Sequence, residues 1–312
     1  MALRLRLCAV YTVAVCVLFT GCSVYVPATK LNSGAASDAR NVRVGTSMLP
    51  EAKKSTLLYI SLASGEVYVY TYPANKFVGQ LYGITSPEGL CSDKSGHVFV
   101  PDTYLQEVAE YAHGDTQPIA TFTQYGSDWG PISCAVDPAT NNLAVQSDGS
   151  HDLYIVKDES SNATVYYNPY GFGYLGGTYD GSGNFFMRGS RYHISELPKG
   201  SPTFINIKVS RGINPPEGFA WDGKYLSITN GDTAGNTEYR IHVHGTHATI
   251  VSKTLLKGSR LVRQFTIYNH RFIAPDQFAS QVTFWKYPVF GNPVGAIEDL
   301  TEPLGSAISV AH

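Results

Sequence analysis

The chain has 312 residues, of which 15% are charged, and its formal net charge is −2. This near-neutral balance excludes the basic surface that nucleic-acid binding requires. Gly (30), Tyr (21) and Phe (14) are plentiful, as is typical of short strands and tight turns rather than of helices or disorder. After the N-terminus, no apolar run approaches the roughly 20 residues of a membrane-spanning helix.

The N-terminal residues have the pattern of an export signal. Two arginines precede an apolar run over residues 7–18, and Phe19-Thr20-Gly21-Cys22 follows. This ending resembles a bacterial lipobox, in which Cys22 would become the lipidated first residue, although Phe19 stands where Leu is usual. We therefore predict a lipoprotein-type signal peptide over residues 1–22. Ordinary cleavage with free secretion and an uncleaved anchor remain as alternatives.

Residues 23–55 are polar and contain Pro, Ser, Ala and Gly, which predicts a flexible linker. Ser23, and not Asp, follows Cys22, which favours the outer membrane in bacteria with two membranes. The expected location is the outer membrane, the periplasm or the cell surface through the lipid anchor, or else the medium. The membrane would be contacted only through that anchor.

From residue 56 onward, one motif recurs. In Ser86 to Val100 (SPEGLCSDKSGHVFV), a short apolar strand ends at an Asp, a turn follows, and a second strand begins. The same plan returns three times, and the turn aspartates are 44, 43 and 42 residues apart: Asp93, Asp137, Asp180 and Asp222. A repeat of this length predicts a propeller or solenoid. Each Asp is expected to bond its own turn backbone.

Two more strands are predicted in each repeat. The third strands fall at residues 66–72, 107–111, 152–157, 192–197, 239–244 and 281–287. The fourth strands, which are more polar, fall at residues 77–81, 119–123, 164–167, 203–207, 249–254 and 294–297. Four short strands per repeat correspond to a propeller blade.

The two ends of the folded region complete each other. The N-terminal repeat lacks a first strand, and residues 307–311 supply one. We therefore predict an all-β domain over residues 56–312, a six-bladed β-propeller of four-stranded antiparallel blades. Its ring is closed by pairing of the C-terminal strand with the N-terminal blade, which removes exposed sheet edges. The expected state is a monomer.

The motif P-x-G-Φ-x-x-D-x-x-G-x-Φ-x-V, where Φ is apolar, resembles the six-bladed propellers of the NHL, TolB-like and senescence-marker/gluconolactonase-like group. The resemblance covers almost all of residues 56–312. It is specific for the architecture and not for function, because this fold hosts lyases, lactonases, scaffolds and ligand binders.

Glu88 and Glu217 occupy the same place in the motif and are 129 residues apart. Three blades separate them, so we expect them to face each other at one mouth of the central channel. They would hold a cation or a polar ligand or do acid–base work. The alternative is that both carboxylates are solvated and help to fix the conformation of the loop that enters each strand.

In the gluconolactonase-like enzymes, a Glu at the start of an inner strand is a metal ligand with Asn and Asp partners. The resemblance implies this role for Glu88 or Glu217. The equivalent positions of the other blades supply no Asn or Asp, which leaves the ligand set incomplete: Ile132, Leu175, about Gln264 and Leu304.

Loops after the second strands are expected to reach the same mouth. Their polar residues are candidate ligand contacts, with ordinary turn formation as the alternative. They are Asp102, Asp148, Arg188, Arg191, Asn230, Asp232 and Asp276.

Cys91 and Cys134 lie on neighbouring inner strands, one residue out of register, so their side chains point in opposite senses. An interblade disulfide is the expectation, with two buried free thiols as the alternative. His242, His244 and His247 form H-x-H-x-x-H, a weak candidate zinc site if a hairpin returns His247 to the other two. The alternative is solvated imidazoles.

The sequence favours a non-enzymatic binding or scaffolding module for a small polar ligand, a glycan or a protein. The alternative is a metal-dependent lactonase or lyase of the gluconolactonase or streptogramin-lyase kind, with its site at the channel mouth. The binding-module interpretation predicts no cofactor. The enzyme alternative would use a divalent cation.

Overall fold

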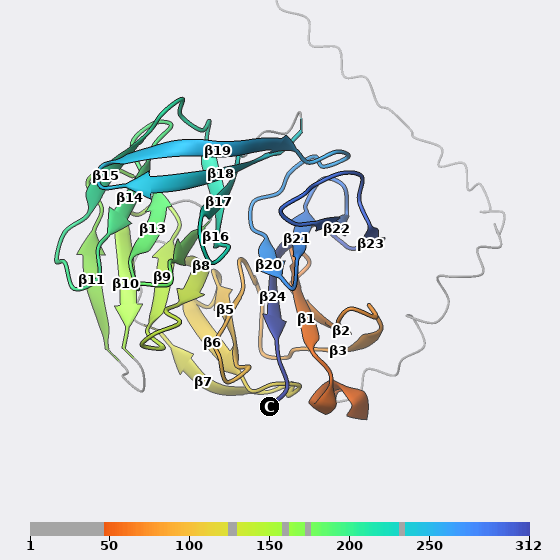
Figure 1. Ribbon diagram of the computed structural model, residues 1–312. Coiled ribbons are helices and arrows are strands. Elements are labelled where there is room, and N and C mark those ends of the chain that lie inside the picture. The colour runs from red at the N-terminus through yellow and green to blue at the C-terminus, as the bar shows by residue number, and fades with distance from the viewer. Residues whose placement is uncertain (1–46, 124–129, 158–161, 172–175, 231–234) are drawn as a thin grey trace, which may run out of the picture. The chain divides into compact units, whose positions relative to one another are not determined.

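The computed structural model describes residues 47–123, 130–157, 162–171, 176–230 and 235–312, and these residues form an all-β structure (Figure 1). Within these ranges, one short 3-10 helix, η1 (Pro50–Lys54), accompanies the strands. No helix in the described part is long and apolar enough to cross a bilayer.

Four sheets have four strands each, and neighbouring strands within each sheet are antiparallel (Figure 1). In hydrogen-bonded order, the first is β24 (Pro303–Ser309), β1 (Leu57–Leu62), β2 (Val67–Thr71) and β3 (Phe77–Gln80). The second is β4 (Cys91–Ser92), β5 (Val98–Asp102), β6 (Glu107–Tyr111) and β7 (Pro118–Phe122). The third is β8 (Pro131–Val136), β9 (Leu143–Ser147), β10 (Asp152–Val156) and β11 (Ala163–Tyr167). The fourth is β20 (Thr266–Tyr268), β21 (Arg271–Asp276), β22 (Gln281–Lys286) and β23 (Gly295–Ile297).

The fifth sheet has eight strands, where the sequence predicted two separate blades of four. One half contains β12 (Gly177–Tyr179), β13 (Phe185–Arg188), β14 (Ile194–Leu197) and β15 (Ile205–Val209). The other half contains β16 (Pro216–Trp221), β17 (Leu226–Asn230), β18 (Thr237–His244) and β19 (His247–Leu255).

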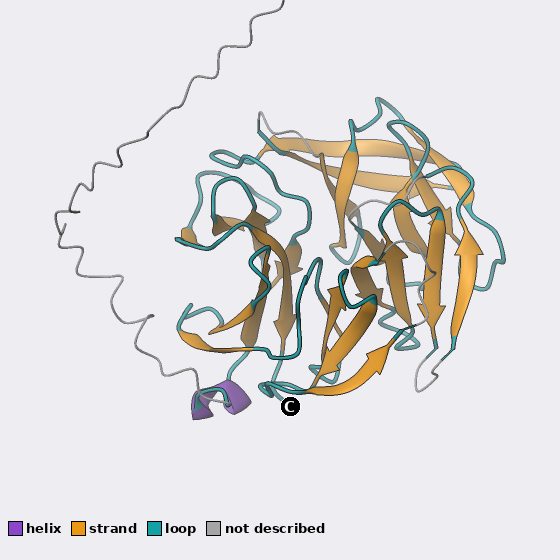
Figure 2. Cartoon of the chain, turned by 180° about the vertical axis from the view of Figure 1, so that it is seen from behind, coloured by secondary structure: helices purple, strands orange, loops and turns teal. Residues whose placement is uncertain are grey.

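The halves of the eight-stranded sheet join because β15 and β19 run parallel, with Lys208 opposite His247 and Val209 opposite Ala248. The Lys208 N–H donates to the Thr246 carbonyl at 2.9 Å. β18 and β19 form a long hairpin across one side of the structure (Figures 1 and 2). The nine residues of β19 give it the length to meet β15.

The predicted pairing of the C-terminal strand with the N-terminal strand is confirmed. β24 runs antiparallel to β1, with Tyr59 opposite Ala307 and Leu57 opposite Ser309. The Ser61 hydroxyl, fully buried, accepts the Gly305 N–H at 2.9 Å, which fixes the register at one end. The first sheet is thus built from both ends of the described chain.

The first strand of each predicted repeat lies at the centre of a propeller-like arrangement. β24, β4, β8, β12, β16 and β20 each contact the next in that order, and β20 contacts β24. Glycines allow this close approach. A side-chain carbon at Gly305 would lie 2.8 Å from the Glu88 carbonyl and 2.3 Å from Gln264 Oε1. The Gly of the repeated P-x-G motif therefore has a packing role.

The turn aspartates bond their own turns, as predicted. Asp93 Oδ1 accepts the His97 N–H at 2.7 Å, and Asp180 Oδ1 accepts the N–H groups of Ser182 and Asn184. Asp222 Oδ1 accepts the Tyr225 N–H at 2.7 Å. A short carboxylate side chain supplies an acceptor that the tight turn lacks in its backbone.

The core lies between the sheets, because both faces of most strands are covered. Every residue of β1 is buried. Leu57 and Tyr59 pack in one cluster with residues of β5, while Leu58 and Ile60 pack in another with residues of β21 and β22. Such strands form near-continuous apolar runs, in which alternate side chains serve different neighbours.

The predicted linker ends earlier than residue 55. Met48 and Ala52 are buried in the same cluster as Leu57, and the Leu49 N–H donates to the Val78 carbonyl at 2.8 Å. Composition suggested a flexible segment, but Met48 and Ala52 bury apolar surface against the first sheet. The rest of residues 23–55, and the predicted signal peptide over residues 1–22, lie outside the described residues.

Candidate functional site

Glu88 lies in the segment just before β4, and Glu217 lies in β16, which belongs to a different sheet. The Glu88 N–H donates to the Pro101 carbonyl at 3.1 Å, and its own carbonyl accepts the Ser61 hydroxyl at 2.5 Å. Glu217 is the second residue of β16. Backbone hydrogen bonds therefore hold Glu88, and Glu217 lies in a paired strand, which suits a preorganised site.

Arg263 links the two acids electrostatically. Burial raises the pKa of Glu88 to about 7, with Asp148 raising it further and Arg263 opposing the shift. Burial also raises the pKa of Glu217, opposed by Arg263 and Arg188. One guanidinium thus lies close enough to act on both carboxyl groups. That the two acids face each other across the channel mouth stays a prediction.

Several polar atoms around Glu88 and Glu217 are buried without a hydrogen-bond partner among the described residues. They include Glu217 Oε2, Arg263 Nε and Gln146 Nε2. Glu88 and Arg263 line a small cavity of about 10 Å³, roughly the room that one water molecule needs. A buried polar atom without a partner is costly, so these groups favour a polar occupant.

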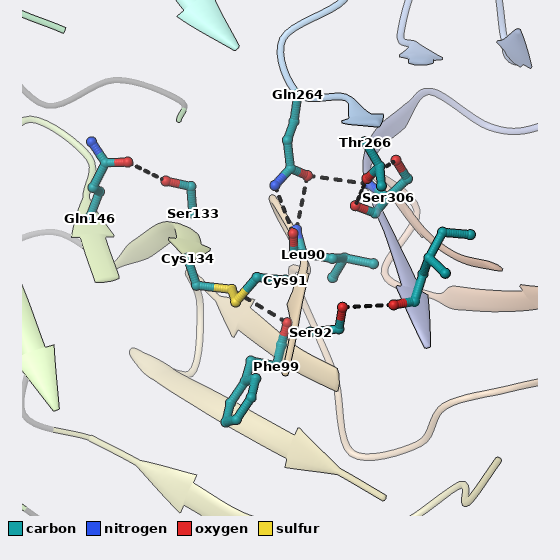
Figure 3. The surroundings of a disulfide bond; sticks show 11 residues. Leu90, Cys91, Ser92, Phe99, Ser133, Cys134, Gln146, Gln264, Thr266 and Ser306 are labelled. Carbon is teal, nitrogen blue, oxygen red and sulfur yellow. Dashed lines mark hydrogen bonds between the residues drawn. A yellow bond between two sulfur atoms is a disulfide. The ribbon is translucent and has the colours of Figure 1, made fainter. Parts of the chain in front are cut away.

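Gln264 lines both this cavity and a larger one, and Figure 3 shows its hydrogen bonds to neighbouring strands. Its Oε1 accepts the Leu90 N–H at 2.9 Å and the Ser306 N–H at 3.2 Å, while its Nε2 donates to the Leu90 carbonyl at 2.8 Å. One side chain therefore joins three sheets at the centre. The alignment of the repeats put about Gln264 at the position equivalent to Glu88, but it marked neither Gln264 nor Arg263 as a site residue, because their repeat lacks the P-x-G motif.

Asp102, Asp276 and Asn230 hold loops together. Asp102 is buried, and its carboxylate accepts four backbone N–H groups, from Thr85, Ser86, Tyr104 and Leu105. Asp276, also buried, accepts those of Arg260, Leu261 and Ala279. Asn230 Oδ1 accepts the Thr237 N–H at 2.6 Å. These contacts favour the turn-forming alternative over ligand binding.

The other loop candidates divide between the site and the surface. Asp148 and Arg188 both lie within electrostatic reach of the site, since they shift the pKa of Glu88 and Glu217 respectively. Arg191 is exposed and has a φ of 52° in the turn after β13. Asp232 lies outside the described residues.

Cys91 and Cys134 form a disulfide between β4 and β8, with a Cα–Cα distance of 5.6 Å (Figure 3). Beside it, the Gly89 N–H donates to the Ile132 carbonyl at 2.9 Å. The covalent link therefore joins two sheets whose inner strands share few hydrogen bonds. This is the arrangement that the one-residue offset of the cysteines favoured.

The hairpin of β18 and β19 places His244 opposite His247, and the rings of His242 and His244 lie 4.0 Å apart between centroids. His242 pairs with Thr249 and not with His247, so the imidazoles of His242 and His247 do not lie directly opposite each other. Within the described ranges, no group of three His, Cys, Asp or Glu side chains is arranged to hold a metal ion.

Glu88→Gln is expected to flatten the pH dependence of stability. The pKa of Glu88 is raised by burial to about 7, above its ordinary value of 4.5. Its contribution to stability is therefore complete below about pH 4.5 and is lost as the pH rises through about 7. Urea midpoints at about pH 5 and about pH 8 measure the difference between wild type and variant.

Glu298→Gln, at an exposed position, is the control for Glu88→Gln. Buried Glu238 also has a pKa raised to about 7, so wild type retains some pH dependence from other groups. An identical pH dependence in wild type and Glu88→Gln would contradict the assignment of Glu88 as a buried, neutralised acid.

No family model matches the sequence, and no curated protein matches it either. Solved structures do match the fold. A chain in the crystal structure of a nidogen/laminin complex is 15% identical, with 83% of this chain and 100% of that chain covered and a TM-score of 0.63. A protein of unknown function from Bacteroides caccae is 11% identical, with 82% and 99% covered and a TM-score of 0.64.

Apo AztD from Citrobacter koseri is 12% identical, with 81% of this chain and 98% of that chain covered and a TM-score of 0.51. At such low identities the comparisons show the fold alone. Together with the arrangement of the sheets, they show that the chain is a β-propeller.

Proposed function

We propose that this protein is a non-enzymatic binding module that takes a small polar ligand at the channel mouth formed by Glu88, Glu217 and Arg263. The observation that carries the proposal is the shared guanidinium. Arg263 acts on both half-buried carboxyl groups, yet no ion pair within 4.0 Å joins it to either acid in the described structure.

The chemistry of these groups defines the ligand. A neutral carboxyl group at Glu88 donates and accepts hydrogen bonds, and the guanidinium of Arg263 only donates. Glu217 Oε2 and Arg263 Nε are buried and unpaired among the described residues, so a ligand with both donors and acceptors would satisfy them. A compact hydroxylated or zwitterionic molecule has this character.

A thermal-shift titration of the full-length chain tests the binding function. The probes are glucose, N-acetylglucosamine, free arginine and free glutamate. At least one is expected to raise the midpoint of wild type, and Arg263→Gln is expected to lose that shift. Arg191→Gln, which changes an exposed arginine, should keep it. If no probe shifts wild type, or if the two variants behave alike, the proposed site is wrong.

A metal-dependent lactonase or lyase is the second candidate, because a pKa of about 7 suits Glu88 to general acid–base work. Metal analysis of the purified chain distinguishes the two. The binding module is expected to hold no stoichiometric ion and to remain folded as Glu88→Gln/Glu217→Gln. A stoichiometric divalent ion that this double variant loses would reverse our ranking.

We also propose that the ring has six blades, with the eight-stranded sheet counting as two. Two features support this count: the parallel contact of β15 and β19 involves only two residue pairs, and six inner strands contact one another in a circuit. A glycan or a protein partner remains compatible with the ring. The nidogen/laminin structure is a complex of proteins that includes this fold.

We propose further that the protein is exported by the signal over residues 1–22 and anchored through lipidated Cys22, placing the ring in the cell envelope. The lipobox-like ending of the signal supports this. Cys22→Ser is expected to move the protein from the membrane to the soluble fraction, and unchanged partitioning would contradict anchoring.

A further inference from the structure

The largest cavity described in the ring lies on the other side of Gln264 from Glu88. It has a volume of about 400 Å³. Its lining comes from the inner strands and the residues beside them, and on each inner strand it lies on the side toward the turn that follows. The lining residues are 90–92, 134–136, 138, 177–179, 219–221, 264–268 and 306–308.

The wall of this cavity carries no charge. None of its described lining residues is Asp, Glu, Lys, Arg or His. Two of its hydroxyl groups are bonded within the wall: Ser92 Oγ donates to the Ile308 carbonyl at 2.7 Å, and Thr266 Oγ1 donates to the Ser306 carbonyl at 2.8 Å. The smaller cavity, by contrast, is lined by two charged residues, Glu88 and Arg263.

The apolar side chains are divided between two sides of the cavity. Aromatic rings come from β12, β16 and β20, which follow one another around the ring: Tyr179, Phe219, Trp221, Phe265 and Tyr268. Aliphatic side chains and the disulfide come from β24, β4 and β8: Leu90, Cys91, Cys134, Val136 and Ile308. Trp221, Tyr268 and Val136 are partly exposed, so a ligand can reach them from solvent.

We propose that this cavity is a second binding site, for an uncharged small molecule with a flat apolar ring system. Its volume falls within the roughly 300–1,000 Å³ typical of ligand sites. Charged groups would lose solvation there without a partner, whereas a ring would pack between the aromatic and aliphatic sides. This inference does not depend on the proposed function, because the two cavities share only Gln264 among their lining residues.

Titration with N-phenyl-1-naphthylamine tests the proposal on the full-length chain, because this uncharged aromatic probe becomes fluorescent in apolar surroundings. Wild type is expected to give a saturable rise with one probe per chain. Thr178→Phe adds bulk inside the cavity and is expected to weaken binding at least about tenfold. Thr164→Phe, on exposed β11, is the matched control and should bind like wild type.

Trp221→Leu provides a second variant if Thr178→Phe fails to fold, and it is expected to weaken binding by a similar factor. Glu88→Gln/Glu217→Gln should leave probe binding unchanged, which separates this site from the channel mouth. The proposal is overturned if wild type shows no saturable binding. Equal affinity of Thr178→Phe and Thr164→Phe, both folded by circular dichroism, would also overturn it.

Discussion

Replacement of Cys91 and Cys134 by Ala is expected to lower the free energy of unfolding by about 4 kcal/mol, as the loop-entropy model gives for a link of this span. The disulfide closes a loop with a sequence separation of 43. In that model the link stabilises the fold by restricting the unfolded chain. It also joins β4, a strand of two residues, to β8.

Urea unfolding with and without reductant measures this contribution. Wild type should lose stability in reductant, while the double Ala variant should be insensitive to it. Peptide mapping under non-reducing conditions should recover one peptide pair that contains both cysteines. Free thiols at both positions in protein purified without reductant, or equal midpoints for wild type with and without reductant, would contradict the prediction.

Asp222→Ala is expected to cost about 3 kcal/mol, because it leaves a partly buried arginine without its partner. Asp222 Oδ2 accepts Arg240 Nε at 2.8 Å and the Tyr287 hydroxyl at 2.8 Å. The side chain of Asp222 is 3% exposed and that of Arg240 is 18% exposed. The guanidinium also lies over the Tyr225 ring, 4.6 Å from its centroid.

Asp180→Ala is the matched control for Asp222→Ala. Asp180 makes the same turn contacts, but no described ion pair involves it, so its loss should cost only about 1 kcal/mol. The larger effect of Asp222→Ala should be seen as a lower urea midpoint. Equal losses in the two variants would show that the Arg240 contact contributes nothing measurable.

The effect of Asp222→Ala should depend on pH. Burial tends to raise the pKa of Asp222, but hydrogen bonds from Tyr225, Tyr287 and Arg240 lower it below its usual value. A lowered acid pKa stabilises the fold above the unfolded value, and this contribution is lost as the pH falls. The difference between wild type and variant should therefore be full at about pH 7 and shrink below about pH 4.

The sequence predicted features that depend on local pattern. Alternating strands, the turns at Asp93 and Asp180, and the pairing of residues 307–311 with the first strand all follow from one repeated motif. The offset of Cys91 and Cys134 in that motif placed them on adjacent strands. Such features depend only on strand register and chain direction, and both can be derived from the period of the motif.

Features that depend on side chains from different repeats were not predicted. Gln264 bonds Leu90 and Ser306 across three sheets, and no local pattern marks a residue that serves its neighbours in this way. The parallel contact of β15 and β19 depends on where two outer strands meet in space. Arg263 lies next to Gln264, which the alignment put near the Glu88 position, but nothing in this irregular repeat marked Arg263 itself as a site residue.

The pairing of β24 with β1 has a consequence for how the protein is made. Ser61 and the Gly305 that bonds it are separated by 244 positions, so β1 leaves the ribosome long before its partner exists. Until then the nascent first sheet has an unpaired apolar edge, which favours aggregation, and contacts of such long range form slowly. During synthesis, holdase chaperones are expected to recognise β1 above other segments, and release should follow only after residues 303–309 have emerged.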